Sequence, residues 1–230
     1  MQYTRWVDKA TAFLKQIRCS RRAAVKARAR SFPPLPAAAV SAIEKKIDRP
    51  VPKPIRSFWI NTTSGFDFRY EWTLSTELQE RIGGLLSGQS NLFGGARLCP
   101  ARDLATLLTD CSDWANSTWI ADSAYELRIW EAAFPLCALR NGDFLALDCR
   151  KKNDDPPVIY LSHEDTSQHL APDLATFLKA WEGLCYIGPE IWMLRPFIDR
   201  RTGYLDRNCT NAERIRHLFR QTAVPRKSLS

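Results

Sequence analysis

The strongest structural signals in this chain lie in residues 134–181, FPLCALRNGDFLALDCRKKNDDPPVIYLSHEDTSQHLAPDLATFLKAW. Two apolar runs, 134–139 and 144–149, flank the turn Asn141-Gly142-Asp143. An Asn-Gly pair between apolar runs is a strong hairpin signal, because both positions tolerate positive φ. A third run, Val158 to Leu161, is rich in β-forming residues. These patterns predict three successive strands.

An amphipathic helix follows the third strand. Its apolar residues recur at helical spacing and include Leu170, Leu174, Phe177, Leu178 and Trp181, and Pro172 suits a first helical turn. Strands capped by a helix predict an α+β fold. We expect one mixed or antiparallel sheet, of about five or six strands as is usual for a sheet, packed against helices, with helical extensions at both ends.

Outward from this stretch the patterns are weaker. We predict two short helices within 37–60 and a strand over 66–72. Gly83-Gly84 and Gly94-Gly95 indicate irregular chain, a helix is expected from near Pro100, and the ambiguous segment 125–130 would fit a strand. Thr76 with Gln79 and Thr210 with Glu213 indicate capping boxes, each opening a helix.

Composition excludes several classes of protein. With 230 residues, 45% of them hydrophobic, the chain can bury a substantial core and is not disordered. The run from Ala132 to Leu139 falls far short of the roughly 20 apolar residues of a membrane span. No secretory signal is visible, so we expect a cytoplasmic protein. The seven cysteines form no Cys-x-x-Cys pair and indicate reduced thiols in the core.

Charge divides the chain into three predicted segments. Residues 1–30 hold nine Lys/Arg and one acid, and residues 195–230 hold nine Lys/Arg and three acids, whereas residues 31–194 carry a net charge of −6. We therefore predict a basic amphipathic N-terminal helix over 1–31, a central domain over 32–194 and a basic helical extension over 195–230. An acidic domain suits a basic partner.

The N-terminal segment allows several interpretations. Trp6, Ala10, Phe13, Leu14 and Ile17 share one helical face, and a basic, alanine-rich stretch continues to Arg30. The helix would dock this stripe on the domain, or contact nucleic acid or anionic lipid. The composition also fits an organellar transit peptide.

Catalytic signatures are sparse. His163-Glu164-Asp165 is the one cluster that suggests a general base, yet consecutive residues of an extended loop point to opposite faces. The histidines lack metal-ligand spacing, and the Gly-Gly pairs lack the context of a phosphate loop. We therefore expect no enzyme activity, no metal and no cofactor.

Three motifs in order carry a family resemblance. They are Asn141 to Asp148, Val158 to His163, and Phe177 to Trp181. A Pro-x-x-aliphatic-x-x-Phe-Trp helix that reaches Trp59 precedes them, followed by Ser64-Gly65, where the family usually has Asn-Gly. The pattern over residues 33–190 resembles the SUKH superfamily (the Smi–Knr group). The motif residues expected to have a structural role are Trp59, Gly65, Gly142, Asp143, Tyr160, His163, Phe177 and Trp181.

The resemblance implies a binding module rather than a catalyst. Many SUKH domains are bacterial immunity proteins that neutralise a cognate toxin, so we expect a secreted toxin domain as the partner. Asp67, Asp143, Glu164 and Asp165 are the acidic residues we predict to contact it. The alternative is a regulatory adaptor that contacts nucleic acid or another anionic surface through residues 1–30 and 195–227.

Overall fold

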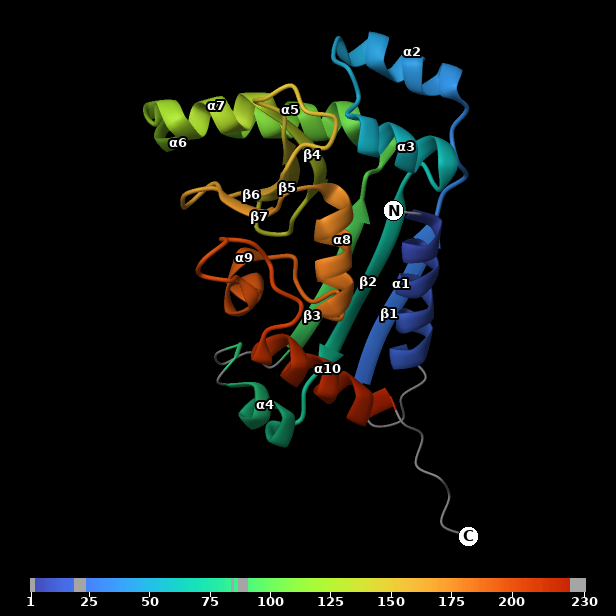
Figure 1. Cartoon of the computed structure of the whole chain (residues 1–230), viewed down its shortest axis with the longest axis vertical. Coiled ribbons are helices and arrows are strands. Elements are labelled where there is room, and N and C mark those ends of the chain that lie inside the picture. The colour runs from blue at the N-terminus through green and yellow to red at the C-terminus, as the bar shows by residue number, and fades with distance from the viewer. Residues whose placement is uncertain (1–2, 19–23, 84, 87–90, 224–230) are drawn as a thin grey trace.

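The computed structural model describes residues 3–18, 24–83, 85–86 and 91–223 (Figure 1). Its helices are α1 (Tyr3–Arg18), α2 (Ala37–Ile47), α3 (Lys53–Asn61), α4 (Thr76–Gly83), α5 (Leu104–Ala115), α6 (Thr118–Asp122), α7 (Ala124–Ala132), α8 (Leu174–Gly183), α9 (Ile191–Leu194) and α10 (Thr210–Ala223). Short 3-10 turns are η1 (Ala101–Asp103) and η2 (Arg195–Phe197). Its strands are β1 (Ala24–Ser31), β2 (Phe66–Thr73), β3 (Asn91–Leu98), β4 (Ala133–Ala138), β5 (Phe144–Asp148), β6 (Val158–Leu161) and β7 (Gln168–Ala171).

The described strands form two antiparallel sheets, with orders β1-β2-β3 and β4-β5-β6-β7. The predicted α+β class is confirmed, but the prediction of one sheet is wrong. The two sheets meet just beyond β3, where the backbone N–H of Cys99 donates to the carbonyl of Leu136 on β4 at 2.7 Å. Local sequence patterns do not indicate which strands pair with one another, so the division of the strands into two sheets could not be predicted from them.

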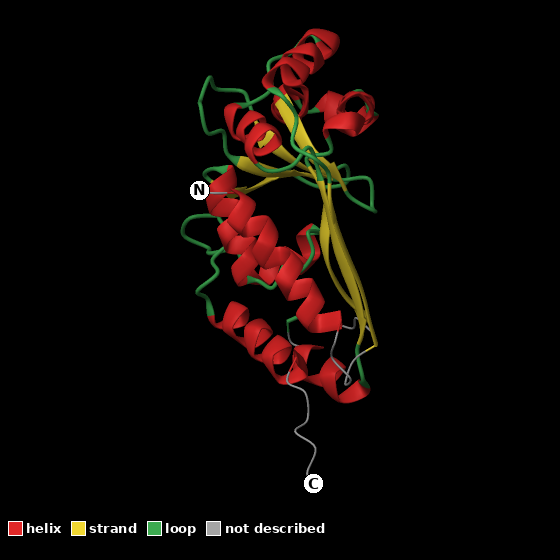
Figure 2. Ribbon diagram, turned by 90° about the vertical axis from the view of Figure 1, so that its right-hand side faces the viewer, coloured by secondary structure: helices red, strands yellow, loops and turns green. Residues whose placement is uncertain are grey.

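The main core lies on one face of the β1–β3 sheet. Alternate residues of β2, from Phe66 to Trp72, are buried there, and α1, α8 and α10 cover them (Figure 2). Trp6 of α1 is 1% exposed, and its ring stacks on Trp181 of α8 at 6.3 Å and meets Phe68 edge-on at 5.4 Å. Large buried side chains contribute roughly 1.5–3 kcal/mol each, so α1 stabilises the fold substantially.

The basic stretch after α1 is a strand and not the predicted helical continuation. β1 pairs with β2 along its whole length, from Ala24 opposite Thr73 to Ser31 opposite Phe66. Val25 and Ala27 pack on the core while Lys26 is exposed, which is a period of two residues rather than 3.6. Alanine and arginine favour helices in isolation, and pairing with β2 overrides that preference.

Gly94-Gly95 lies inside β3 and not in irregular chain, which corrects another prediction. A Cβ on Gly94 would lie 2.2 Å from the carbonyl oxygen of Tyr186, and Gly95 has a φ of +78°. The segment after α8 crosses close to β3 here, where the N–H of Gly95 donates to the same oxygen at 2.8 Å. Glycine inside a strand often marks such a close approach of another backbone.

The β4–β7 sheet carries the predicted meander. Gly142 lies in the β4–β5 turn with a φ of +93°, which confirms its predicted conformation. One face packs on α8 and the other on α5 and α7, so β5 and β6 are buried throughout. β7 was not predicted, because Leu170 also fits the helical spacing of α8 and was assigned to that helix. In the structure Leu170 belongs to β7, and α8 begins only after the Asp173 cap.

Three local predictions near helix starts are corrected. Residues 125–130 are helical, and Ser123 caps α7 by accepting from the N–H of Glu126 at 3.3 Å. The helix α4 is capped by Ser75 rather than Thr76, because Ser75 Oγ accepts from Leu78 N. At α10 the residue before the helix is Cys209, whose carbonyl accepts from Glu213 N. Both predicted capping boxes are therefore wrong by one residue.

Free thiols lie mostly in the core, as predicted. Cys99, Cys111, Cys137 and Cys185 are buried, and burial raises the pKa of Cys137 to about 12. Cys19 lies outside the described residues. Within the part of the chain that is described, no helix is both long and apolar enough to cross a membrane.

Candidate protein-binding surface

Asp143 is the centre of a buried polar network. Its carboxylate accepts hydrogen bonds from the hydroxyl of Tyr160, from Asn141 Nδ2, and from both the backbone N–H and Nδ1 of His163, the last two at 2.9 and 2.7 Å. Only 3% of the residue is exposed. The prediction that Asp143 offers a surface charge is therefore wrong, because intramolecular donors surround it. Its role is to hold the β4–β5 turn against the loop after β6.

The ring of His163 fills the space beside this network. It lies 4.4 Å from the ring of Trp114 on α5, measured between centroids, and the His163 side chain is 15% exposed. Gly142 is close to both, since a Cβ there would lie 3.3 Å from the Trp114 ring. Tyr160 is buried, and this burial, together with its hydrogen bond to Asp143, raises the pKa of its hydroxyl well above the usual value.

Two predicted acidic residues lie together on the loop after β6. The side chains of Glu164 and Asp165 are 83% and 60% exposed. Ser162 Oγ accepts from the backbone N–H of Asp165 at 3.0 Å, which folds the loop into a tight turn. Asp165 also pairs with Arg195 at 3.0 Å. The loop therefore presents the carboxylate of Glu164, and that of Asp165 in an ion pair with Arg195, on a base fixed by the Asp143 network.

Asp67 does not join this loop. It lies on the outer face of β2, in the other sheet, and its carboxylate is shared by Arg28 at 3.1 Å and Arg69 at 3.0 Å. A carboxylate flanked by two guanidinium groups does not add negative charge to a surface. Its predicted role in binding a basic partner therefore has no support in its surroundings.

Exposed aromatic residues stand next to the loop. Among the described residues, the large aromatic side chains that are exposed are Trp119, at 36%, and Tyr125, at 51%. Trp119 Nε1 donates to the carbonyl of His163, which ties α6 to the loop. The hydroxyl of Ser167 donates to Glu126 at 2.6 Å and ties α7 to it as well. Sequence patterns carried no signal for this exposure, because tryptophan is usually core.

The helices beside the loop are strongly acidic. Residues 103–131 hold six acids and one arginine, and Asp113 and Asp122 are exposed among them. We define the acidic surface as the exposed residues Asp113, Trp119, Asp122, Tyr125, Glu164 and Asp165. The contacts of Trp114 and Trp119 with His163 place α5 and α6 beside the loop, so these residues belong to one region of the molecule.

The remaining motif residues hold the two sheets together. Trp59 Nε1 donates to the carbonyl of Cys99 at 2.8 Å, and a Cβ on Gly65 would lie 3.1 Å from Pro100. Both residues thus pack on the segment that links β3 to the second sheet. Phe177 and Trp181 are fully buried in α8, and Trp181 Nε1 donates to Ile187 at 2.8 Å. All four positions are buried.

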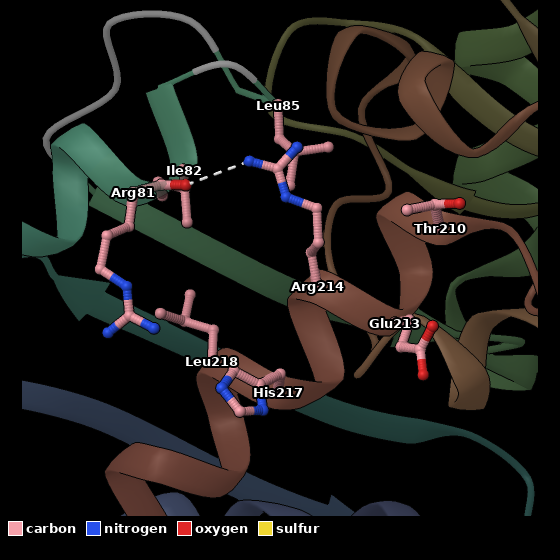
Figure 3. Close-up of a pocket in the computed structure, with 8 residues that line it drawn as sticks. All are labelled: Arg81, Ile82, Leu85, Thr210, Glu213, Arg214, His217 and Leu218. Carbon is pink, nitrogen blue, oxygen red and sulfur yellow. Dashed lines mark hydrogen bonds between the residues drawn. The ribbon is translucent and has the colours of Figure 1, made fainter.

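A hollow of about 500 Å³ lies between α4 and α10, toward the end of the molecule opposite α6 and α7 (Figures 1 and 3). Arg214 donates to the carbonyl of Arg81 at 3.4 Å, and Arg81 itself donates to Gln221 at 2.7 Å. Arg216 of the same helix donates to the carbonyls of Gly183 and Arg207. These arginines of the basic C-terminal segment therefore serve helix packing, which weakens the alternative of a nucleic-acid contact there.

The structure defines a two-sheet α+β domain in which a buried motif network supports an exposed acidic loop. The chain belongs to the SMI1/KNR4 family (SUKH-1), whose model matches residues 34–180. This family includes toxin-immunity proteins. A comparison with curated proteins finds no match. The match leaves out α1, β1, α9 and α10, so part of the packed core of this chain lies outside the family pattern.

Proposed function

We propose that this protein is a non-catalytic immunity protein that neutralises a basic toxin domain by covering it with the acidic surface. The observation that carries the proposal is the pair of exposed aromatic residues, Trp119 and Tyr125, on two helices that are hydrogen-bonded to the loop carrying the carboxylates of Glu164 and Asp165. Membership of a family that includes immunity proteins supports it.

The physical properties of the acidic surface suit a tight protein interface. Tryptophan and tyrosine are enriched among the residues that dominate binding energy, because they bury a large area with few rotatable bonds. The carboxylates accelerate the encounter with a basic partner. The Asp143 network holds the loop in place before binding, so little conformational entropy is lost when the complex forms.

A catalytic role for His163 is not favoured by its surroundings. Asp143 and His163 resemble the orienting pair of a hydrolase, since Asp143 binds Nδ1. The other ring nitrogen, Nε2, lies 3.5 Å from Glu164, and in the described residues no hydroxyl or thiol is hydrogen-bonded to it. The Glu164 carboxylate beside Nε2 has no proton for His163 to remove and is not a nucleophile that the histidine activates. We therefore infer a structural role for His163.

Growth rescue tests the proposed function. Toxin domains encoded beside the gene for this chain would be expressed with and without the full-length protein, and one of them should be tolerated only in its presence. A variant carrying Tyr125→Ala, and a second carrying Glu164→Lys, should lose this protection while keeping the melting temperature. Asp154→Lys is the matched control, because Asp154 is an equally exposed carboxylate outside the acidic surface. Protection that survives all of these changes would disprove the assignment.

A further inference from the structure

The outer face of the β1–β3 sheet is basic. Cross-strand pairing places three rows there: Arg30–Asp67–Arg97, Arg28–Arg69–Gly95 and Lys26–Glu71–Phe93. Arg28 and Arg69 share the single carboxylate of Asp67, so their combined charge is only half compensated. No helix covers this side of the long strands in Figure 2.

Two hollows open on this face. One, of about 370 Å³, is lined by Lys26, Arg28, Arg69, Glu71 and Arg140 among others, and a second, of about 230 Å³, lies beside Phe93, Gly95 and Arg97. Arg69 and Arg140 line both, so the hollows adjoin. Gly95 has no side chain to fill the space opposite Arg69, and Arg140 extends over the ring of Phe93 at 5.9 Å.

The edge of the same sheet is free. Among the described strands, β1 pairs with β2 alone, so its other side presents backbone N–H and C=O groups along eight residues. Lys26, Arg28 and Arg30 alternate along it and are exposed. Charged residues on an edge strand discourage pairing with an uncharged or like-charged strand. An incoming strand with acidic residues at alternate positions would meet a cation at each of them.

We propose that the free edge and outer face of the β1–β3 sheet bind an extended acidic segment of a protein partner, which adds to β1 as a strand. Backbone hydrogen bonds supply affinity in this mode, and alternate side chains supply specificity. The site is separate from the acidic surface and does not depend on the proposed function.

Other occupants fit the surface less well. Two copies of β1 pairing antiparallel would place cations against cations, which is destabilising. The acidic residues 104–131 of a second copy are held mostly in helices and offer no strand. A nucleic acid would set phosphates against Asp67 and Glu71, which stand between the cations, and would leave the backbone groups of the edge unpaired.

Fluorescence anisotropy of a labelled peptide tests the proposal on the full-length protein. The probe is an extended peptide of alternating glutamate and threonine, and the same peptide with lysine in place of glutamate is the probe control. Lys26→Gln combined with Arg28→Gln should weaken binding about two- to thirtyfold, because two exposed charge pairs are lost. The double variant should still fold, since Asp67 retains its ion pair with Arg69. Lys45→Gln combined with Lys46→Gln removes the same charge from the exposed side of α2 and should leave affinity unchanged.

Hydrogen exchange distinguishes strand addition from simple charge attraction. Binding of the acidic peptide should slow amide exchange within residues 24–31, since the free edge becomes paired. Absence of binding, binding with no protection of β1, or equal weakening by the α2 variant would each overturn the proposal. Tighter binding of single-stranded oligothymidine, lost in the β1 variant, would also overturn it and would assign the face to nucleic acid.

Discussion

One carboxylate oxygen of Asp143 accepts hydrogen bonds from both the backbone N–H and the imidazole Nδ1 of His163. The two residues are twenty positions apart in the chain but lie at the same end of the β5–β6 pair, where Phe144 is opposite Leu161, and this double contact joins the β4–β5 turn to the acidic loop. Asp143 is therefore buried beneath the acidic surface and holds its loop in place, and it is not one of the exposed residues of that surface.

Removing this carboxylate should destabilise the protein. We expect Asp143→Ala to lower the free energy of unfolding by about 2–4 kcal/mol, because the buried donors of Tyr160 and His163 lose a charged acceptor. Urea denaturation of the variant measures the change. Asp154→Ala is the control, since it breaks an exposed ion pair with Lys53 and should cost at most about 1 kcal/mol. Equal effects in the two variants would show that the Asp143 network contributes little.

The turn at Gly142 should not tolerate a branched side chain. Gly142→Val forces a β-branched residue into a φ of +93°, and its Cβ would press on Trp114 at 3.3 Å. We expect a loss of about 1–3 kcal/mol, the usual cost of a strained backbone position. Thermal unfolding measures it, with Gly83→Val as the comparison, because nothing lies within 4 Å of a Cβ there and no positive φ is involved. An unchanged melting temperature at Gly142 would contradict the strain.

The N-terminal helix should be required for folding, contrary to what its place outside the family match suggests. Trp6→Ala removes a side chain that is 1% exposed and stacks on Trp181, and we expect it to cost about 3–5 kcal/mol. Gln16→Ala, on the exposed side of the same helix, should change stability by no more than about 0.5 kcal/mol. Chemical denaturation compares the two, and a Trp6 variant as stable as the Gln16 variant would show α1 to be dispensable.

Acid should weaken the fold partly through Asp148. Burial disfavours its charged form, but hydrogen bonds from His169 and Arg150 outweigh this and hold the pKa of Asp148 below its usual value of 3.8. A carboxylate with a lowered pKa in the folded state stabilises the protein above the unfolded-state pKa, and this contribution is lost as the pH falls below it.

The measurement is the free energy of unfolding between pH 6 and pH 3, compared with Asp148→Asn. The wild-type protein should lose more unfolding free energy across this range than the variant, because asparagine at position 148 does not titrate. This extra loss should appear only as the pH approaches 3. Parallel curves for the two proteins would mean that Asp148 is not held ionised by its partners.

Local patterns in the sequence were sufficient for the meander and its helix. The Asn-Gly turn, the run of β-forming residues from Val158 to Leu161 and the spacing of Phe177 and Trp181 each reflect backbone preferences within a few residues. These signals do not depend on distant contacts, so the structure matches them at β5, β6 and α8. The SUKH family likeness rests on the same short motifs, and the family match confirms it.

Features that depend on residues far apart in the chain could be assigned only from the packed structure. Residues 24–31 are a strand because β2 pairs with them, and Gly94-Gly95 lies in a strand because the Tyr186 backbone crosses it. Asp143 is buried because Tyr160 and His163 close over it, while Trp119 is exposed because α6 has no further layer outside it. Burial and strand pairing are properties of the packed whole, so composition and periodicity could not assign these residues to core, edge or surface.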